Sequence, residues 1–271
     1  MKTRIITGVV AAALFLPFLF FAPTVLFGWV MAAVVLIAVW EMTGCVQQRA
    51  RLWVSLPLAL GCGSVPVLFG YGKNAVAYTV LVLTVMTVFA GMIVFSEKTD
   101  VNDGSVMLLF CLYATLGFAS LVSLRAGNDV FKTYLYLWPF LAAWITDTFA
   151  YFCGRMFGRR KLCPKVSPKK TVEGALGGIV FCMIFSLLFG LIIAAISKTQ
   201  IKWLSFLLIG LVLSIISQIG DLVMSLVKRK YGIKDYGNLL PGHGGILDRF
   251  DSVIATSLTL SALLPVLTLF K

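Results

Sequence analysis

Charged residues are scarce in this chain. Only 13% of its 271 residues are charged and 60% are hydrophobic, whereas roughly a quarter of a typical soluble domain is charged. The mean hydropathy is +0.98. The chain has too few polar residues to cover the surface of a water-soluble globular protein of this size. The same composition excludes disordered and fibrous proteins. The sequence therefore predicts a polytopic integral membrane protein.

Acidic residues, histidine and paired cysteines are scarcer still. The chain has 11 acidic and 23 basic residues, a net charge of +12 and one histidine. In a membrane protein this excess of cations indicates contact with anionic lipid headgroups and asymmetric loops, so we expect no nucleic-acid partner. The six cysteines include no Cys-x-x-Cys pair, which favours small apolar packing residues over a zinc site or a disulfide framework.

Nine apolar runs are long enough to cross a bilayer as helices. They cover residues 5–22, 24–43, 52–71, 75–96, 105–124, 134–154, 174–196, 203–224 and 251–270. Met1–Pro23 begins like a signal peptide, with basic residues before an apolar run, but no small-residue cleavage site follows. We therefore expect a retained helix there, and an all-α protein with about nine transmembrane helices.

The basic residues are distributed unevenly over the loops between these runs. If the N-terminus is cytoplasmic, 17 of the 23 Lys and Arg residues fall on the cytoplasmic side. Cytoplasmic loops of membrane proteins carry such an excess. We therefore expect a multi-pass protein of the inner cell membrane, with a cytoplasmic N-terminus and the C-terminus on the opposite side.

Polar side chains are concentrated in two blocks, of which the first reads WITDTFAYFCGRMFGRRKLCPKVSPKKTVEG. Asp147, Tyr151 and Arg155 follow one another at intervals of four, so a helix places them on one face. An aspartate inside a membrane span is costly and marks a candidate functional site. The segment SPKKTVE, just before the next helix, adds hydroxyl, ammonium and carboxyl groups suited to phosphate binding: Ser167, Lys170, Thr171 and Glu173.

The second block reads SQIGDLVMSLVKRKYGIKDYGNLLPGHGGILDRFD. Ser217, Asp221 and Ser225 also follow at intervals of four, and Lys228 comes seven residues after Asp221. One helix face thus presents hydroxyl, carboxylate, hydroxyl and ammonium groups where the helix leaves the membrane.

The end of the second block combines glycines with carboxylates. Gly244 and Gly245 allow the backbone to approach phosphate oxygens closely. Asp248 and Asp251 lie one helical turn apart at the start of the last apolar run, and together with Asp221 they offer oxygen ligands to a hard cation.

Each of these features also has a purely structural explanation. Asp147 and Arg155 can pair with each other, acidic residues in a first turn complement the helix dipole, and glycines make turns. His243 is the only histidine and does not make a metal site by itself. The density of carboxylates, cations and glycines on one side of the membrane nevertheless favours a functional site.

The second block resembles the signature of phosphatidate cytidylyltransferases, or CDP-diacylglycerol synthases: S-x-aliphatic-K-R, four residues, K-D, a small residue two further on, then H-G-G-aliphatic-x-D-R-x-D. The matching positions are Ser225, Lys228, Arg229, Lys234, Asp235, Gly237, His243, Gly244, Gly245, Asp248, Arg249 and Asp251. The first block is similar to the family in its W-x-x-D-x-x-A-Y-x-x-G-R and S-P-K-K-T-x-E-G segments. The resemblance covers residues 144–252, and Trp40-Glu41 is a further family-like pair. Met224 departs from the family, which often has an acidic residue there.

The resemblance implies that CTP and phosphatidate react at the cytoplasmic membrane face to give CDP-diacylglycerol and pyrophosphate. It also implies Mg²⁺, with room for a second cation, and a homodimer in the lipid bilayer. The implied metal ligands are Asp221 and Asp248, with Asp251 as a third, and the implied catalytic residues are Asp221, Lys228, Arg229 and Asp248. The expected substrate-binding residues are Asp147, Tyr151, Arg155, Ser167, Lys170, Thr171, Glu173, Ser225, Lys234, Asp235, His243, Gly244, Gly245 and Arg249.

We expect residues 1–130 to form anchoring and dimerisation helices and residues 131–271 to form the catalytic transmembrane domain. Two other functions stay open. A CTP-dependent enzyme of the polyprenol-kinase kind would transfer the γ-phosphoryl group instead of the cytidylyl group. A cation-coupled transporter would use Asp147 and Asp221 as coupling sites, but such transporters usually show internal repeats, and none is visible here.

Overall fold

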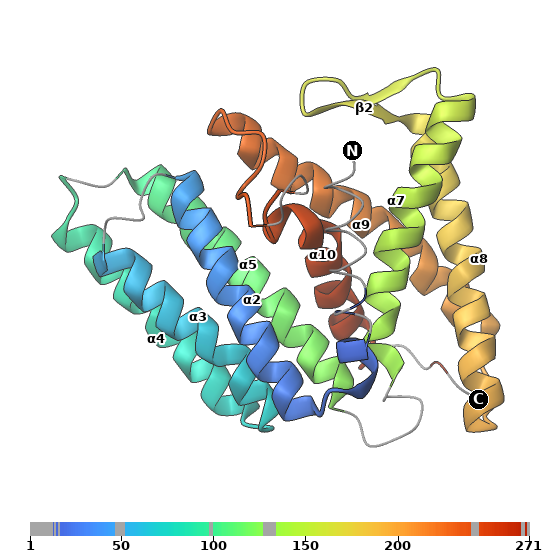
Figure 1. Ribbon diagram of the computed structural model, residues 1–271, viewed down its shortest axis with the longest axis horizontal. Coiled ribbons are helices and arrows are strands. Elements are labelled where there is room, and N and C mark those ends of the chain that lie inside the picture. Colours follow the sequence, from blue (N-terminus) through green and yellow to red (C-terminus); the bar gives the residue numbers. More distant parts are fainter. Residues whose placement is uncertain are drawn as a thin grey trace. The chain divides into compact units, whose positions relative to one another are not determined.

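The described part of the chain is almost entirely helical (Figure 1). The computed structural model describes residues 13, 15, 17–46, 52–97, 100–126, 134–239, 244–266 and 269. Within these residues the only sheet is a two-stranded hairpin. The predicted all-α class is therefore confirmed, with a hairpin that hydropathy did not indicate.

The helices follow the predicted apolar runs to within a few residues at most ends. They are α2 (Thr24–Cys45), α3 (Leu52–Gly70), α4 (Asn74–Val94), α5 (Val101–Arg125), α7 (Leu137–Phe157), α8 (Val172–Ser197), α9 (Trp203–Lys230) and α10 (Leu247–Leu263). Among the described residues, six helices are long and apolar enough to cross a membrane: α2, α3, α4, α5, α8 and α9. The chain is thus a multi-pass membrane protein.

The count of nine spans stays a prediction. The first predicted run, 5–22, lies largely outside the described residues, although 17–21 are helical. Helix α10 has 17 residues, and its predicted run extends into a segment that is only partly described. Helix α7 has 21 residues but includes Asp147 and Arg155, which lower its hydropathy.

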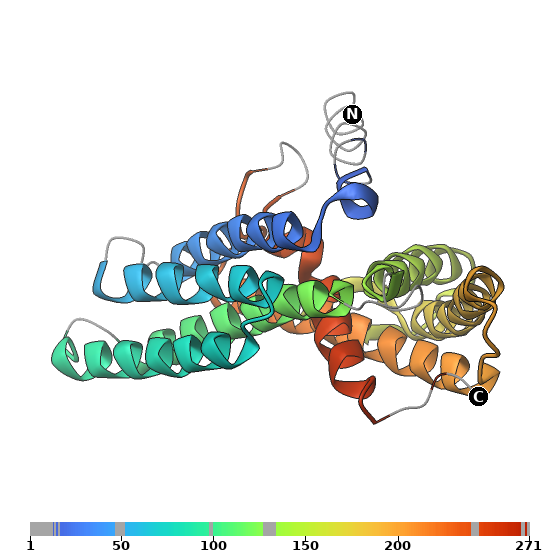
Figure 2. The same cartoon turned by 90° about the horizontal axis from the view of Figure 1, so that it is seen from below.

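One compact unit consists of residues 1–123 and 230–250. Within it α3 packs against both α2 and α4 (Figure 2). Helices α2 and α3 approach closely, since a Cβ atom added to Gly28 would lie 2.8 Å from the carbonyl oxygen of Pro66. Tyr231, just beyond α9, donates a hydrogen bond of 2.7 Å to Asp103 on α5. Burial and this hydrogen bond raise the pKa of Tyr231, so its hydroxyl remains a donor at neutral pH.

The second compact unit consists of residues 124–229 and 251–271. Side-chain hydrogen bonds join its helices in pairs. Such bonds help helices associate in a membrane, because lipid tails are as apolar as the helix surfaces and apolar contacts alone give little preference for another helix. Three of these bonds are Trp138 Nε1 to Ser186 Oγ at 3.0 Å, Thr146 Oγ1 to Ser214 Oγ at 2.9 Å and Ser252 Oγ to the Ser217 carbonyl at 3.1 Å. The expected functional division at residue 130 stays a prediction.

Candidate functional site

A β-hairpin connects α7 to α8 at one end of the second unit (Figure 1). Its strands are β1 (Lys161–Cys163) and β2 (Ser167–Thr171), which pair antiparallel with Lys161 opposite Thr171. A backbone hydrogen bond of 3.2 Å from Val166 to the Cys163 carbonyl closes the turn. The hairpin carries the SPKKT segment, so it places that segment as a strand beside the helix ends.

Two side chains at the start of α8 hold the base of this hairpin. The Glu173 carboxylate accepts backbone hydrogen bonds from Arg159 at 3.0 Å and from Arg160 at 3.2 Å. Thr171 caps α8, since its Oγ1 accepts a hydrogen bond of 3.2 Å from the Gly174 N–H. The Glu173 carboxylate thus orders the chain that enters β1, and its substrate-binding role stays a prediction.

Glycines let the hairpin and α8 lie against the end of α7. A Cβ atom added to Gly154 would lie 2.8 Å from Thr171 Oγ1, and one added to Gly174 would lie 2.5 Å from the Ala150 carbonyl oxygen. A larger residue at Gly174 would therefore require a shift of backbone, and one at Gly154 would displace the Thr171 hydroxyl. This close approach brings β2 next to the polar face of α7.

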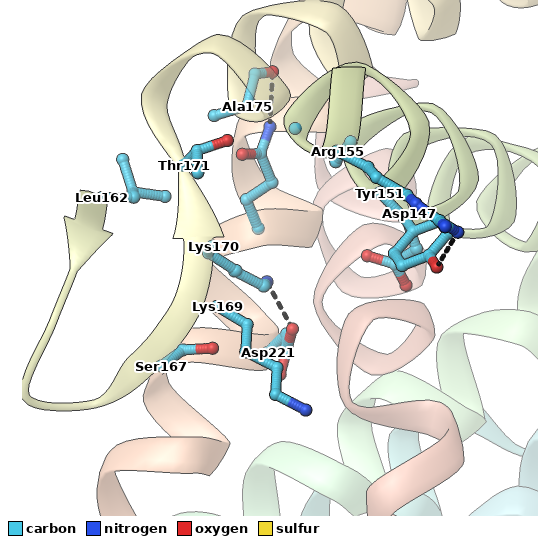
Figure 3. A pocket seen from close by; sticks show the side chains of 13 residues that line it. Asp147, Tyr151, Arg155, Leu162, Ser167, Lys169, Lys170, Thr171, Ala175 and Asp221 are labelled. Carbon is cyan, nitrogen blue, oxygen red and sulfur yellow. Dashed lines mark hydrogen bonds and ion pairs between the residues drawn. The ribbon is translucent and has the colours of Figure 1, made fainter. Parts of the chain in front are cut away.

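A cavity of about 430 Å³ lies between the hairpin, α7, α8 and α9. The polar side chains of the cavity come from α7, from the hairpin and from α9, which belong to the two sequence blocks (Figure 3). The lining residues are Asp147, Ala150, Tyr151, Gly154, Arg155, Leu162, Ser167, Lys169, Lys170, Thr171, Ala175, Gln218 and Asp221. The structure thus brings together the predicted Asp147–Tyr151–Arg155 face, the SPKKT segment and Asp221.

An ion pair crosses this cavity. The Lys170 ammonium from β2 contacts the Asp221 carboxylate from α9, and each side chain is 25% exposed (Figure 3). Asp147 on α7 lies within electrostatic reach of both groups. Next to Asp147, Arg155 donates a hydrogen bond of 3.3 Å to the Tyr151 hydroxyl. The cavity therefore offers fixed cations and carboxylates at the end of a membrane helix bundle.

Further charged groups of the second unit surround Asp221. Ser225 Oγ donates a hydrogen bond of 3.2 Å to Asp221 Oδ1. The buried Asp251 interacts electrostatically with Asp221, Asp147 and the buried Lys228. Three aspartates and two lysines thus share this region, and Arg155 and Lys169 also line the cavity.

The described residues contain no group of three or more His, Cys, Asp or Glu side chains arranged to hold a metal ion. This does not conflict with a magnesium site, because Mg²⁺ usually takes one or two protein carboxylates and completes its shell with water and substrate phosphates. Asp221 is partly exposed and lines the cavity together with Asp147.

The remaining predicted residues are not among those that line this cavity. Arg229 is exposed and is the last α9 residue of the second unit, while residues 230–250 belong to the first unit. The predicted residues of that first unit are the exposed Lys234, Asp235 and Arg249, together with Gly244, Gly245 and Asp248. Asp248 Oδ2 accepts backbone hydrogen bonds from Tyr236 at 2.7 Å and Gly245 at 2.9 Å. His243 lies outside the described residues.

Two polar lining residues were missed by sequence reasoning. Gln218 lies one helical turn before Asp221, and its Nε2 donates a hydrogen bond of 3.3 Å to the Ala175 carbonyl. The interval of three from Asp221 was the available signal. Lys169 lines the cavity beside Lys170, although neighbouring strand residues normally point to opposite faces.

Comparison with known proteins gives a consistent result. A sequence model described as the cytidylyltransferase family matches residues 2–267. The chain is 36% identical over 266 residues to a phosphatidate cytidylyltransferase of Bacillus subtilis (strain 168), covering 94% of each chain. It is 33% identical over 262 residues to the protein of the same name from Staphylococcus haemolyticus (strain JCSC1435), covering 93% of this chain and 94% of that one. A third relative of this name, from Staphylococcus aureus (strain COL), is 34% identical over 264 residues.

Proposed function

Because the chain belongs to the cytidylyltransferase family, we propose that it transfers the cytidylyl group of CTP to phosphatidate. The products are CDP-diacylglycerol, a precursor for phospholipid biosynthesis, and pyrophosphate. The observation that carries this assignment is the cavity of the second unit, where Lys170, Asp221 and Asp147 meet at the end of a membrane helix bundle. The family match supplies the substrates, and the cavity supplies groups suited to them.

The reaction is a phosphoryl-type substitution. An oxygen of the phosphatidate phosphate forms a bond to the α-phosphorus of CTP, and the bond from that phosphorus to the bridging oxygen of the β-phosphate breaks. Pyrophosphate leaves with that oxygen. The attacking phosphate is already an anion, so no covalent enzyme nucleophile is needed, and most of the catalysis is positioning and charge neutralisation.

The cations of the cavity match this requirement. Lys170 lies on β2, and Arg155 projects from α7 on the opposite wall (Figure 3). Arg155 can bind two phosphate oxygens at once through its planar guanidinium, whereas Lys170 acts as a point charge. Ser167, Thr171 and Tyr151 add hydroxyl groups around the same volume. Lys228, buried near Asp251, adds a further ammonium group.

Magnesium is part of the proposal. Bound Mg²⁺ would supply Lewis-acid neutralisation of the phosphate oxygens. Asp221 is the proposed ligand in the cavity, where its carboxylate is partly exposed. Asp248 and Asp251 stay as the other ligands expected from the sequence, and a second cation remains part of the proposal.

The proposed orientation places the active site, and the N-terminus, on the cytoplasmic side. The hairpin supports this, since Arg159, Arg160, Lys161, Lys165 and Lys169 are all exposed, and such clusters are retained on the cytoplasmic side of membranes. CTP is dissolved in the cytoplasm and phosphatidate lies in the bilayer, so a site at this face reaches both. A homodimer formed through the N-terminal helices completes the proposal.

Separately labelled CTP tests the function. The purified protein in detergent is mixed with phosphatidate, Mg²⁺ and CTP labelled at the α- or at the γ-phosphate. We expect the α label in the lipid product and the γ label in pyrophosphate. Appearance of the γ label in the lipid would instead identify a lipid kinase, and cation flux without CTP turnover would identify a transporter.

A further inference from the structure

Glu41 is a buried carboxylate in α2 of the first unit. Its side chain is only 2% exposed, and burial of an ionised carboxylate is costly unless hydrogen bonds replace its hydration. Its two oxygens accept backbone hydrogen bonds from the far end of the chain. Glu41 Oε1 binds the Ile246 N–H at 2.8 Å and Oε2 binds the Leu247 N–H at 2.9 Å.

These two bonds fall at the beginning of α10. The first N–H groups of any helix lack partners within the helix, and they carry the positive end of its dipole. Helix α10 begins at Leu247, so a carboxylate from another helix here takes the place of a local capping residue. Glu41 therefore fixes where α10 begins relative to α2.

The segment before α10 is shaped to fit the Glu41 carboxylate. A Cβ atom added to Gly237 would lie 2.6 Å from Glu41 Oε1, and a Cβ atom added to Gly245 would also collide with the carboxylate. Two glycines that match the family signature thus leave the space that Glu41 occupies. A cavity in the same unit, lined by Glu41, Asp235, Tyr236 and Gly237 among others, adjoins the carboxylate.

The same segment holds Asp248. Its Oδ2 accepts the N–H groups of Tyr236 at 2.7 Å and Gly245 at 2.9 Å. Gly245 immediately precedes Ile246, which binds Glu41. A movement of the segment away from Glu41 would therefore also move the donors that hold the Asp248 carboxylate.

We infer that Glu41 is a positioning residue, which fixes residues 236–239 and 244–247 against α2 and thereby sets the place of the Asp248 carboxylate. The link to catalysis rests on the proposed function, in which Asp248 is an expected Mg²⁺ ligand. The link to the segment rests only on the hydrogen bonds and close contacts of Glu41 in the first unit.

Glu41→Gln tests whether Glu41 holds the segment in place. The amide has nearly the shape of the carboxylate but presents an N–H₂ group to one of the two backbone donors, so that one hydrogen bond is lost. Hydrogen exchange of the full-length protein in detergent, followed by mass spectrometry, reports the amides of residues 236–239 and 244–247. We expect exchange there to rise about 10- to 100-fold, the range for loss of a hydrogen bond to a charged group.

The matched control is Thr43→Val. Thr43 lies two residues further along α2 and is also buried, and its hydroxyl donates a hydrogen bond to the Trp40 carbonyl of the same helix. Thr43→Val should leave exchange in residues 236–239 and 244–247 unchanged. Gly237→Ala pushes the segment from the opposite side and should reproduce the exchange increase, which keeps the test decisive if Glu41→Gln fails to fold.

The connection between Glu41 and the Asp248 carboxylate is tested by titrating Mg²⁺ during pyrophosphate release. We expect Glu41→Gln to raise the Mg²⁺ concentration for half-maximal turnover about tenfold, while Glu41→Asp, which keeps the charge, recovers part of the loss. Unchanged exchange in both Glu41→Gln and Gly237→Ala would overturn the positioning of the segment. Increased exchange with an unchanged Mg²⁺ requirement would overturn the connection to Asp248. Lack of pyrophosphate release by the unmodified protein would refute the proposed function. The exchange measurement would still test whether Glu41 positions the segment.

Discussion

Lys170→Met is the sharpest test of the cavity as the catalytic site. Methionine keeps a flexible apolar stem of similar length and removes the ammonium group of the lysine. In the structure the Lys170 ammonium faces the Asp221 carboxylate and lies within electrostatic reach of Asp147. The substitution therefore leaves two carboxylates without their shared counter-ion, in the volume where the phosphates of CTP and phosphatidate are proposed to bind.

The expected magnitude follows from the exposure of the pair. Two unit charges about 4 Å apart interact by about 4 kcal/mol at the effective dielectric constant of about 20 that suits partly buried sites. Both side chains are 25% exposed, so water and the neighbouring Lys169 and Arg155 replace part of that interaction. We expect kcat/KM for CTP to fall about 10²-fold, the lower end of the effect of removing one electrostatic donor.

The assay is pyrophosphate release in detergent with phosphatidate and Mg²⁺ at fixed ionic strength. Lys165→Met is the matched control, because Lys165 is an exposed lysine of the same hairpin that does not line the cavity. It should stay within about twofold of the unmodified protein, as expected for a surface substitution. A Lys170→Met enzyme within about threefold of normal, or an equal loss in Lys165→Met, would refute the assignment of this cavity.

Two further predictions address the metal and the membrane orientation. Asp221→Asn keeps the shape of the side chain but removes an anionic ligand, so activity should collapse while the thermal unfolding temperature changes little; near-normal turnover at saturating Mg²⁺ would contradict the assignment. Single cysteines at Lys161 and Lys234, both exposed, in a background without native cysteines, should resist an impermeant thiol reagent in intact cells and react after lysis. Labelling of both from outside would reverse the proposed orientation.

The helices were largely predictable because a bilayer imposes both a length and a composition. The run expected at 52–71 is observed as Leu52–Gly70, and the run expected at 75–96 as Asn74–Val94. The eighth run, expected to end at 224, continues to Lys230. Hydropathy detects only the part of a helix that lies in lipid, whereas backbone hydrogen bonding continues into the polar segment beyond.

The hairpin was not predictable from local propensity. Its strands carry Lys and Pro in place of the β-branched and aromatic residues that favour strands. The pairing is supported from outside, by the Glu173 carboxylate on the Arg159 and Arg160 amides and by the Thr171 cap of α8. These contacts depend on how α7 and α8 pack, and a single sequence does not contain that information.

Periodicity predicted what one helix face carries but not what opposes it. The interval of four placed Asp147, Tyr151 and Arg155 on one face, and all three line the cavity. It did not indicate that Lys170 would pair with Asp221, because the two residues lie on different elements 51 positions apart in the chain. Glu41 shows the limit more strongly, since 205 residues separate it from Ile246. A lone acid in an apolar run signals only that the carboxylate needs partners; which N–H groups meet it is decided by the packing of α2 against the start of α10. The positions that depend on tertiary packing are thus the same positions that bring the proposed catalytic groups into place.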